Sequence, residues 1–118
     1  MEKIQNVVIA AAKRTPVGSF QGSISSVSGP DLGAKVIGEI LEETMLDPAS
    51  VNEVIMGNVL TAGLGQAPAR QAALESGLPD TVECTTINKM CGSGLKAAML
   101  ATQAIPVSYT HLTLPTKA

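Results

Sequence analysis

The sequence predicts an α/β fold, with a mostly parallel sheet and helices on both faces. Short apolar runs that suit strands buried on both sides alternate with segments of helical period. Apolar residues make up 45% of the 118 residues, while aromatic residues make up 2%, so the core is built from aliphatic side chains and alanine. Alternation of this kind is typical of parallel strands joined by crossover helices.

The expected order of elements is strand, helix, strand, helix, strand, helix. The apolar run over residues 7–12 predicts a first strand buried on both faces, and glycine and serine predict a loop over residues 16–30. Pro30 suits the first turn of a helix that Asp47-Pro48 ends. The remaining elements are expected at 54–60 (a strand running into a turn), 67–74 (helix), 82–87 (strand) and 92–105 (helix).

Charge and composition exclude several classes of partner and site. Eight Lys and Arg against ten Asp and Glu give a net charge of −2 without a run of like charges, so no nucleic-acid partner is expected. No segment has the pattern of a signal peptide or the length of a membrane span, which predicts a cytoplasmic protein with no membrane partner. The two cysteines form neither a disulfide framework nor a metal site, and they suit a reducing compartment.

The segment over residues 85–97 carries the candidate chemistry, because Cys91 stands where a strand turns into a helix. Unpaired N–H groups and the helix dipole at such a point favour the thiolate over the thiol. Gly92 and Gly94 leave room beside the sulfur for an acyl group. The backbone N–H of Cys91 is a candidate oxyanion donor. We therefore predict that Cys91 is a nucleophile.

Other interpretations of the same residues stay open at this stage. Cys91 could be a small buried apolar residue, as free cysteines often are, and Cys84 is expected to be an inert core residue. Lys89 and Lys96 either raise the local positive potential or are solvated surface residues. A non-catalytic module that pairs its small-residue helices with a partner is a further alternative.

A dinucleotide-binding site of Rossmann type is a second alternative, since residues 92–97 read G-S-G-L-K-A after a strand and at the start of a helix. That fingerprint normally follows the first strand, and it needs an acidic residue about 20 positions later. Here it follows the third expected strand, and Glu83 is the last acidic residue of the chain. Neither observation favours an NAD-dependent oxidoreductase.

The glycine-rich string over residues 57–71 contains no phosphate-binding G-x-x-x-x-G-K-[ST] pattern. We expect a tight loop in which Arg70 and Gln71 tie neighbouring segments together or form a subunit contact. Direct substrate binding by this string is the less favoured interpretation.

Four strings in register resemble the amino-terminal portion of the thiolase family, in its acetyl-CoA acetyltransferase branch. They are residues 8–18 (V-I-A-A-A-K-R-T-P-V-G), 57–60 (G-N-V-L), 63–71 (G-L-G-Q-A-P-A-R-Q) and 87–96 (I-N-K-M-C-G-S-G-L-K). The resemblance extends over residues 1–105. It implies the amino-terminal part of the layered thiolase fold.

The resemblance also implies an activity. Cys91 would accept an acetyl group from acetyl-CoA, and a second acetyl-CoA would then condense with it to give acetoacetyl-CoA and CoA, reversibly. Coenzyme A thioesters are the substrates, and no other cofactor and no metal is implied. In thiolases a histidine, a second cysteine and an Asn-containing oxyanion site come from the carboxyl-terminal half, and no position here matches them. Because those groups are missing, the fragment is expected to be inactive alone. The resemblance also implies that the complete protein is a homo-oligomer, dimer or tetramer.

Residues 106–118 differ in character from the rest of the chain. They have no helical period and contain the only histidine, His111. Residues 107–116 can be encoded by a sequence that resembles a transposase-type library adapter read in one frame. We expect a non-native translated tail here, following a partial domain over residues 1–105, and we do not expect His111 to act in catalysis.

Overall fold

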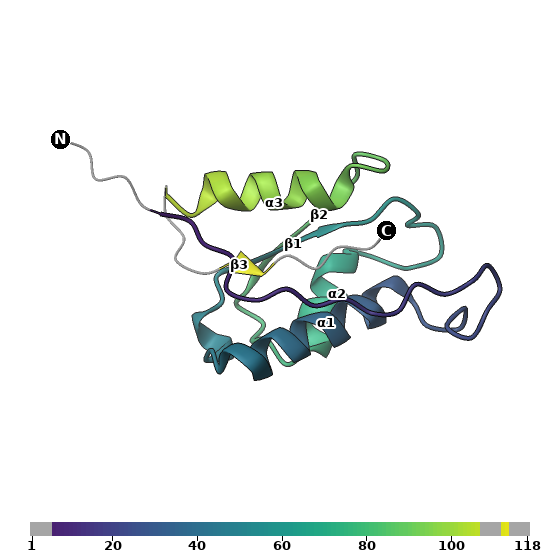
Figure 1. Cartoon of the computed structure of the whole chain (residues 1–118), viewed down its shortest axis with the longest axis horizontal. Coiled ribbons are helices and arrows are strands. Elements are labelled where there is room, and N and C mark those ends of the chain that lie inside the picture. The colour runs from purple at the N-terminus through teal and green to yellow at the C-terminus, as the bar shows by residue number, and fades with distance from the viewer. Residues whose placement is uncertain (1–5, 107–111, 114–118) are drawn as a thin grey trace.

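The computed structural model describes residues 6–106 and 112–113, and its sheet is parallel throughout. Strand β1 (Glu53–Gly57) lies between β2 (Glu83–Ile87) and the short β3 (Leu112–Thr113), as Figure 1 shows. β1 pairs with β2 along its whole length, from Glu53 opposite Glu83 to Gly57 opposite Ile87. The predicted strands at 54–60 and 82–87 are confirmed. Apart from Pro106 and β3, the predicted foreign tail lies outside the described residues, so the domain boundary stays a prediction.

Helices cover both faces of this sheet, as predicted. α1 (Gly29–Thr44) and α2 (Pro68–Glu75) lie on one face, and α3 (Ser93–Ala104) lies on the other (Figure 1). A short 3-10 turn, η1 (Pro48–Ser50), leads from α1 into β1. All three α-helices match their predicted ranges to within two residues. Within the described ranges, the structure contains no helix long and apolar enough to cross a membrane.

The ends of α1 follow from local chemistry. The Ser28 hydroxyl accepts a hydrogen bond from the Asp31 amide at 3.1 Å, which caps the first turn. The helix ends where Met45 adopts the left-handed conformation, with φ of 55°. The Asp47 carboxylate then accepts from the Ala49 amide at 3.0 Å and begins η1. Asp47-Pro48 therefore ends the helix as the sequence predicted.

The larger part of the core lies between the sheet and the α1–α2 pair. Alanines on α2 are fully buried, and their small side chains let α1 approach closely. A Cβ added to Gly33 of α1 would lie 3.2 Å from the Cβ of Ala72. The cluster consists of Ile37, Val51, Val54, Met56, Ala69, Ala72, Ala73, Leu78 and Val82.

The opposite face of the sheet packs on α3 through a smaller cluster of Ile55, Ala97 and Ala101. The closest approach is at the end of β1. A Cβ added to Gly57 would lie 2.7 Å from the carbonyl carbon of Ser93 and 2.8 Å from the nitrogen of Gly94. Because these are backbone atoms at the start of α3, there is no room for any side chain at position 57.

The predicted strand over residues 7–12 is wrong. These residues form no regular structure, and two of the largest side chains are exposed, Val8 at 77% and Ile9 at 88%. An apolar run becomes a strand only where a partner edge supplies its hydrogen bonds, and the edge of β1 at Glu53 and Val54 pairs with β3 instead.

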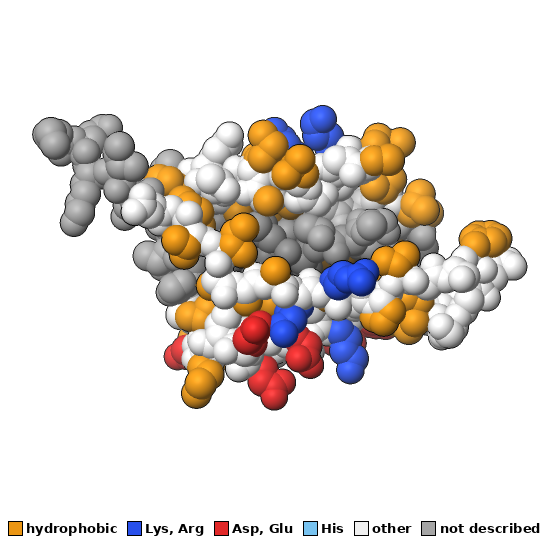
Figure 2. Space-filling view, viewed as in Figure 1, with side chains coloured by type: hydrophobic (Ala, Val, Ile, Leu, Met, Phe, Trp, Pro, Cys, Tyr) orange, Lys and Arg blue, Asp and Glu red, His pale blue; other side chains and the backbone are white. Residues whose placement is uncertain are grey.

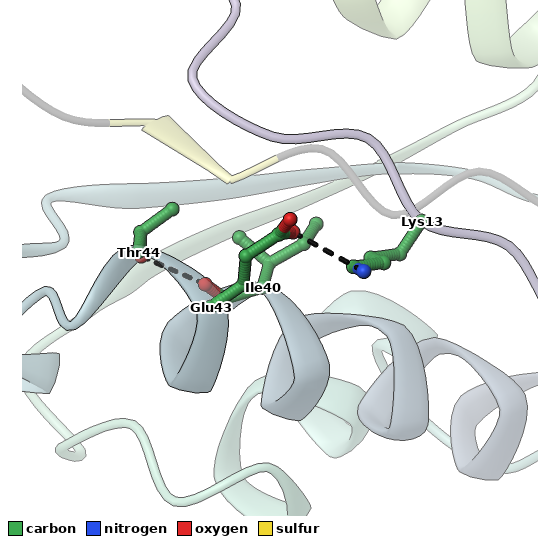
Figure 3. A network of polar contacts seen from close by, with 4 residues as sticks. All are labelled: Lys13, Ile40, Glu43 and Thr44. Carbon is green, nitrogen blue, oxygen red and sulfur yellow. Dashed lines mark hydrogen bonds and ion pairs between the residues drawn. The ribbon is translucent and has the colours of Figure 1, made fainter.

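Beyond this run, the amino-terminal segment is tied to α1 by an ion pair. Figure 3 shows Lys13 pointing toward Glu43, with Nζ 3.3 Å from Oε2. On the same turn of the helix, the Thr44 hydroxyl donates to the Ile40 carbonyl at 2.7 Å. Both side chains of the ion pair are more than a third exposed, so it positions the segment with little contribution to stability.

We expect Gly57→Ala to lower the free energy of unfolding by about 1–3 kcal/mol, because the new methyl group overlaps backbone atoms of α3. Urea denaturation measures the effect. Gly38→Ala is the matched control: an added Cβ there meets nothing within 4 Å on a helix, so it should stabilise by about 0.5–1 kcal/mol. Equal effects of the two substitutions would contradict the close approach at Gly57.

Candidate active site

Cys91 lies in the turn that joins β2 to α3, one residue before the helix N-cap, Gly92. The structure records it as an exposed, free cysteine. The alternative that Cys91 is a buried core residue is therefore wrong. The thiol stands at the amino-terminal end of a 12-residue helix, where the sequence placed it.

Ser93 is buried within this turn and holds its backbone by hydrogen bonds. Its side chain is almost fully buried, with the residue 1% exposed. The hydroxyl accepts from the Lys89 amide at 2.9 Å and donates to the Met90 carbonyl at 2.6 Å. One side chain thus fixes the backbone of both residues that precede Cys91.

Asn88, the residue after β2, holds the same turn by further hydrogen bonds. Its Oδ1 accepts from the Met90 amide at 2.9 Å, an Asx-turn, and its Nδ2 donates to the Val59 carbonyl at 3.4 Å. Met90 adopts a positive φ of 49°, a conformation that non-glycine residues rarely occupy. These hydrogen bonds hold the strained residue in place.

The end of β1 contacts the residues on both sides of this turn. Gly57 contacts the backbone at the start of α3, and the Asn58 amide donates to the Ile87 carbonyl at 2.9 Å. That hydrogen bond continues the β1–β2 pairing from the last residue of β2 to the residue after β1. The position of Cys91 therefore depends on two neighbouring strand ends and one helix start.

Cys84 has a different environment, at the other end of β2. It is half-buried against the α1–α2 core, and its Sγ donates to the Val82 carbonyl at 3.7 Å. Burial raises the pKa of the Cys84 thiol above its usual value, although the nearby Arg70 opposes the shift. Cys84 therefore packs against the core as expected, and its chemical inertness stays a prediction.

Arg70 and Gln71 tie neighbouring segments together, as predicted. Gln71 Nε2 donates to the carbonyls of Leu64 and Gln66, at 2.7 and 2.6 Å, which holds the loop before α2. Arg70 donates to the carbonyls of Val82 and Asp80, at 3.5 and 3.3 Å. Both side chains are therefore engaged in holding the loop to neighbouring segments, and the structure gives them no role in binding phosphate.

Around the turn, two lysines lie on the surface, and no metal-binding group of side chains is found among the described residues. Lys89 is exposed and Lys96 is half-buried, so both lie on the surface around the turn. In the ranges that the structure describes, no three His, Cys, Asp or Glu side chains are grouped so that they could hold a metal ion. The site is therefore a single thiol in a fixed backbone setting.

Sequence reasoning located Cys91 and missed the residues that position it. Ser93 and Asn88 act through hydrogen bonds within the turn, and their signal is a serine and an asparagine flanking a cysteine at a strand-to-helix junction. Asn58 is distant in sequence and carries no such signal. Its importance depends on the packing of β1 against α3.

Comparison with known proteins decides the family. Residues 7–114 match the family model described as the thiolase N-terminal domain. The chain belongs to the thiolase family. This thiolase chain is 61% identical to an acetyl-CoA acetyltransferase of Pseudomonas aeruginosa over 102 residues, which are 86% of this chain and 26% of the relative. An Escherichia coli acetyl-CoA acetyltransferase is 59% identical over the same shares of the two chains.

A solved thiolase has the same fold. The crystal structure of the Acat5 thiolase from Ascaris suum, in complex with coenzyme A, matches with a TM-score of 0.78 at 45% sequence identity. The match covers 81% of this chain and 25% of that one. The predicted thiolase-like layered fold is thus confirmed, and this thiolase chain spans about a quarter of the length of the relatives it matches.

We expect iodoacetamide to alkylate Cys91 of this thiolase chain almost completely before labelling of Cys84 is measurable. Cys91 is exposed, whereas burial both shields Cys84 and raises its pKa, so less of its thiolate is present at neutral pH. Labelling of Cys84 should increase as the pH rises. Peptide mapping at several pH values measures both sites.

Two single variants control the alkylation experiment. Cys91→Ser should remove the fast labelling, and Cys84→Ser should leave it unchanged. Comparable rates at the two cysteines at neutral pH would contradict the placement of Cys91 at the surface and Cys84 against the core.

Proposed function

We propose that the complete protein containing this chain is an acetyl-CoA C-acetyltransferase, with Cys91 as its nucleophile. It would condense two acetyl-CoA to acetoacetyl-CoA and CoA, reversibly. The observation that carries the proposal is the exposed Cys91 thiol on a braced turn at the start of α3. Relatives named acetyl-CoA acetyltransferase, and a thiolase solved with coenzyme A, support the substrate class.

The first half-reaction transfers an acetyl group to the enzyme. The Cys91 thiolate attacks the carbonyl carbon of acetyl-CoA, a new carbon–sulfur bond forms, and the coenzyme A thiolate leaves after the tetrahedral intermediate collapses. Gly92 places no side chain beside the sulfur. The backbone N–H of Cys91 is the proposed donor to the oxyanion.

The second half-reaction forms a carbon–carbon bond. The methyl group of a second acetyl-CoA loses a proton to a base, and the resulting carbanion attacks the acetyl carbon on Cys91. Acetoacetyl-CoA is released, and the sulfur leaves as a thiolate. A rigid turn favours both steps, because one sulfur must serve first as nucleophile and then as leaving group in a fixed position.

Proton transfer requires groups that the described residues do not bring to Cys91. The described residues contain no histidine, and Cys84 lies at the opposite end of β2. We therefore assign three things to the remaining part of the complete protein: the base that deprotonates the Cys91 thiol, the base that removes the methyl proton of the second acetyl-CoA, and the pocket for the coenzyme A moiety. On this proposal the chain is inactive by itself.

The outer face of α3 supports a larger assembly. Leu95 is 71% exposed and Met99 is 49% exposed, and Figure 2 shows hydrophobic side chains along this edge of the molecule. Large apolar residues one helical turn apart are typical of a covered surface. We propose that the rest of the complete protein packs here, that this protein is a cytoplasmic homo-oligomer, and that its two free cysteines stay reduced.

Acetylation of the complete protein by acetyl-CoA tests this function. We expect peptide mapping to find the acetyl group on Cys91 and a coupled assay to detect acetoacetyl-CoA. Cys91→Ser should abolish both signals, whereas Cys84→Ser should retain them. The 118-residue chain alone should form no acetoacetyl-CoA.

Three results would count against the proposal. Acetoacetyl-CoA formation by the isolated chain would show that the bases lie within it. Undiminished activity of the Cys91→Ser protein would remove the nucleophile. A complete protein that takes no acetyl group from acetyl-CoA would favour a non-catalytic interaction module.

A further inference from the structure

Asn58 is a buried polar residue whose side chain is incompletely paired. The residue is 2% exposed, and among the described residues its Nδ2 has no hydrogen-bond partner. A buried amide donor without an acceptor carries a desolvation cost that no hydrogen bond offsets. Among the described residues, therefore, no hydrogen bond of Nδ2 accounts for an asparagine at this position.

The location of Asn58 connects it to the nucleophile turn. Gly57 before it contacts the start of α3, and the Val59 carbonyl after it accepts from Asn88. Its own amide donates to the Ile87 carbonyl. All three consecutive residues thus contact the chain within four residues of Cys91. Asn58 also carries a buried side-chain donor without a partner among the described residues.

We propose that Asn58 is a positioning residue for Cys91, whose side-chain amide serves acyl transfer at the expense of resting stability. The inference rests on the proposed function. Its physical basis is that buried polar groups without a hydrogen-bond partner are rare in folded proteins and are found preferentially at functional sites. The Nδ2 donor is used when the turn carries the acyl group, and it acts on Cys91 through the backbone of residues 57–59 and 87–88.

Asn58→Leu in the complete protein separates this role from a structural one. We expect kcat for acetoacetyl-CoA formation to fall about tenfold or more, with KM for acetyl-CoA little changed, because small misplacements of a reacting group have large effects on rate. The melting temperature should stay equal or rise, since the unpaired donor is removed. Asn58→Gln, which keeps the carboxamide, should restore most of the rate.

Two further measurements make the outcome unambiguous. Thr61→Ala, an exposed change in the same loop, should leave kcat, KM and melting temperature unchanged. The rate of Cys91 alkylation by iodoacetamide should also differ between the Asn58→Leu and the unsubstituted protein, and this readout does not require acetyl transfer. If the unsubstituted protein forms no acetoacetyl-CoA, the proposed function fails, and alkylation alone decides the role of Asn58.

An unchanged kcat and an unchanged alkylation rate in Asn58→Leu would overturn the inference. It would also be overturned if the melting temperature dropped while kcat fell and KM rose together, because that pattern belongs to a residue needed for folding. If Asn58→Leu does not fold, Asn58→Gln and Asn58→Ser take its place. The inference then requires kcat to fall in Asn58→Ser, which lacks the carboxamide, and not in Asn58→Gln, whichever of the two has the lower melting temperature.

Discussion

The close approach of two backbones, at Gly57 of β1 and at the start of α3, is the constraint on which the site depends. Atoms of Ser93 and Gly94 occupy the space where a side chain at position 57 would lie. The helix therefore begins directly over the end of the strand, and the turn before it is held close to the sheet. Since β1 is paired with β2 over its full length, the turn inherits the rigidity of the sheet.

Hydrogen bonds within the turn, together with this contact, fix the backbone that precedes Cys91. Ser93 and Asn88 together bond the Lys89 and Met90 amides and the Met90 carbonyl, so the backbone before Cys91 is almost fully specified. The same bonds stabilise a positive φ at Met90 that isolated chains disfavour. The result is an exposed thiol on a fixed support, an arrangement suited to a sulfur that must react twice in one position.

Most of the fold followed from periodicity, and the errors arose where tertiary context decides. Helices and the β1–β2 pair have strong local signals, but the run over residues 7–12 needed a partner edge, and β3 pairs with that edge of β1. Helical period also did not reveal which side of α3 packs on the sheet, because alanines face inward and Leu95 outward. Cys91 was predicted from its neighbours, whereas Asn58 became visible only through burial.

Amide hydrogen exchange at Lys89 and Met90 tests most directly whether the turn is rigid. Both residues are exposed, yet their amides donate to Ser93 Oγ and Asn88 Oδ1. Nuclear magnetic resonance should show both amides exchanging as slowly as those of the β2 strand. Exchange at the rate of an open loop would show that the sulfur is not held, and it would contradict this description of the site.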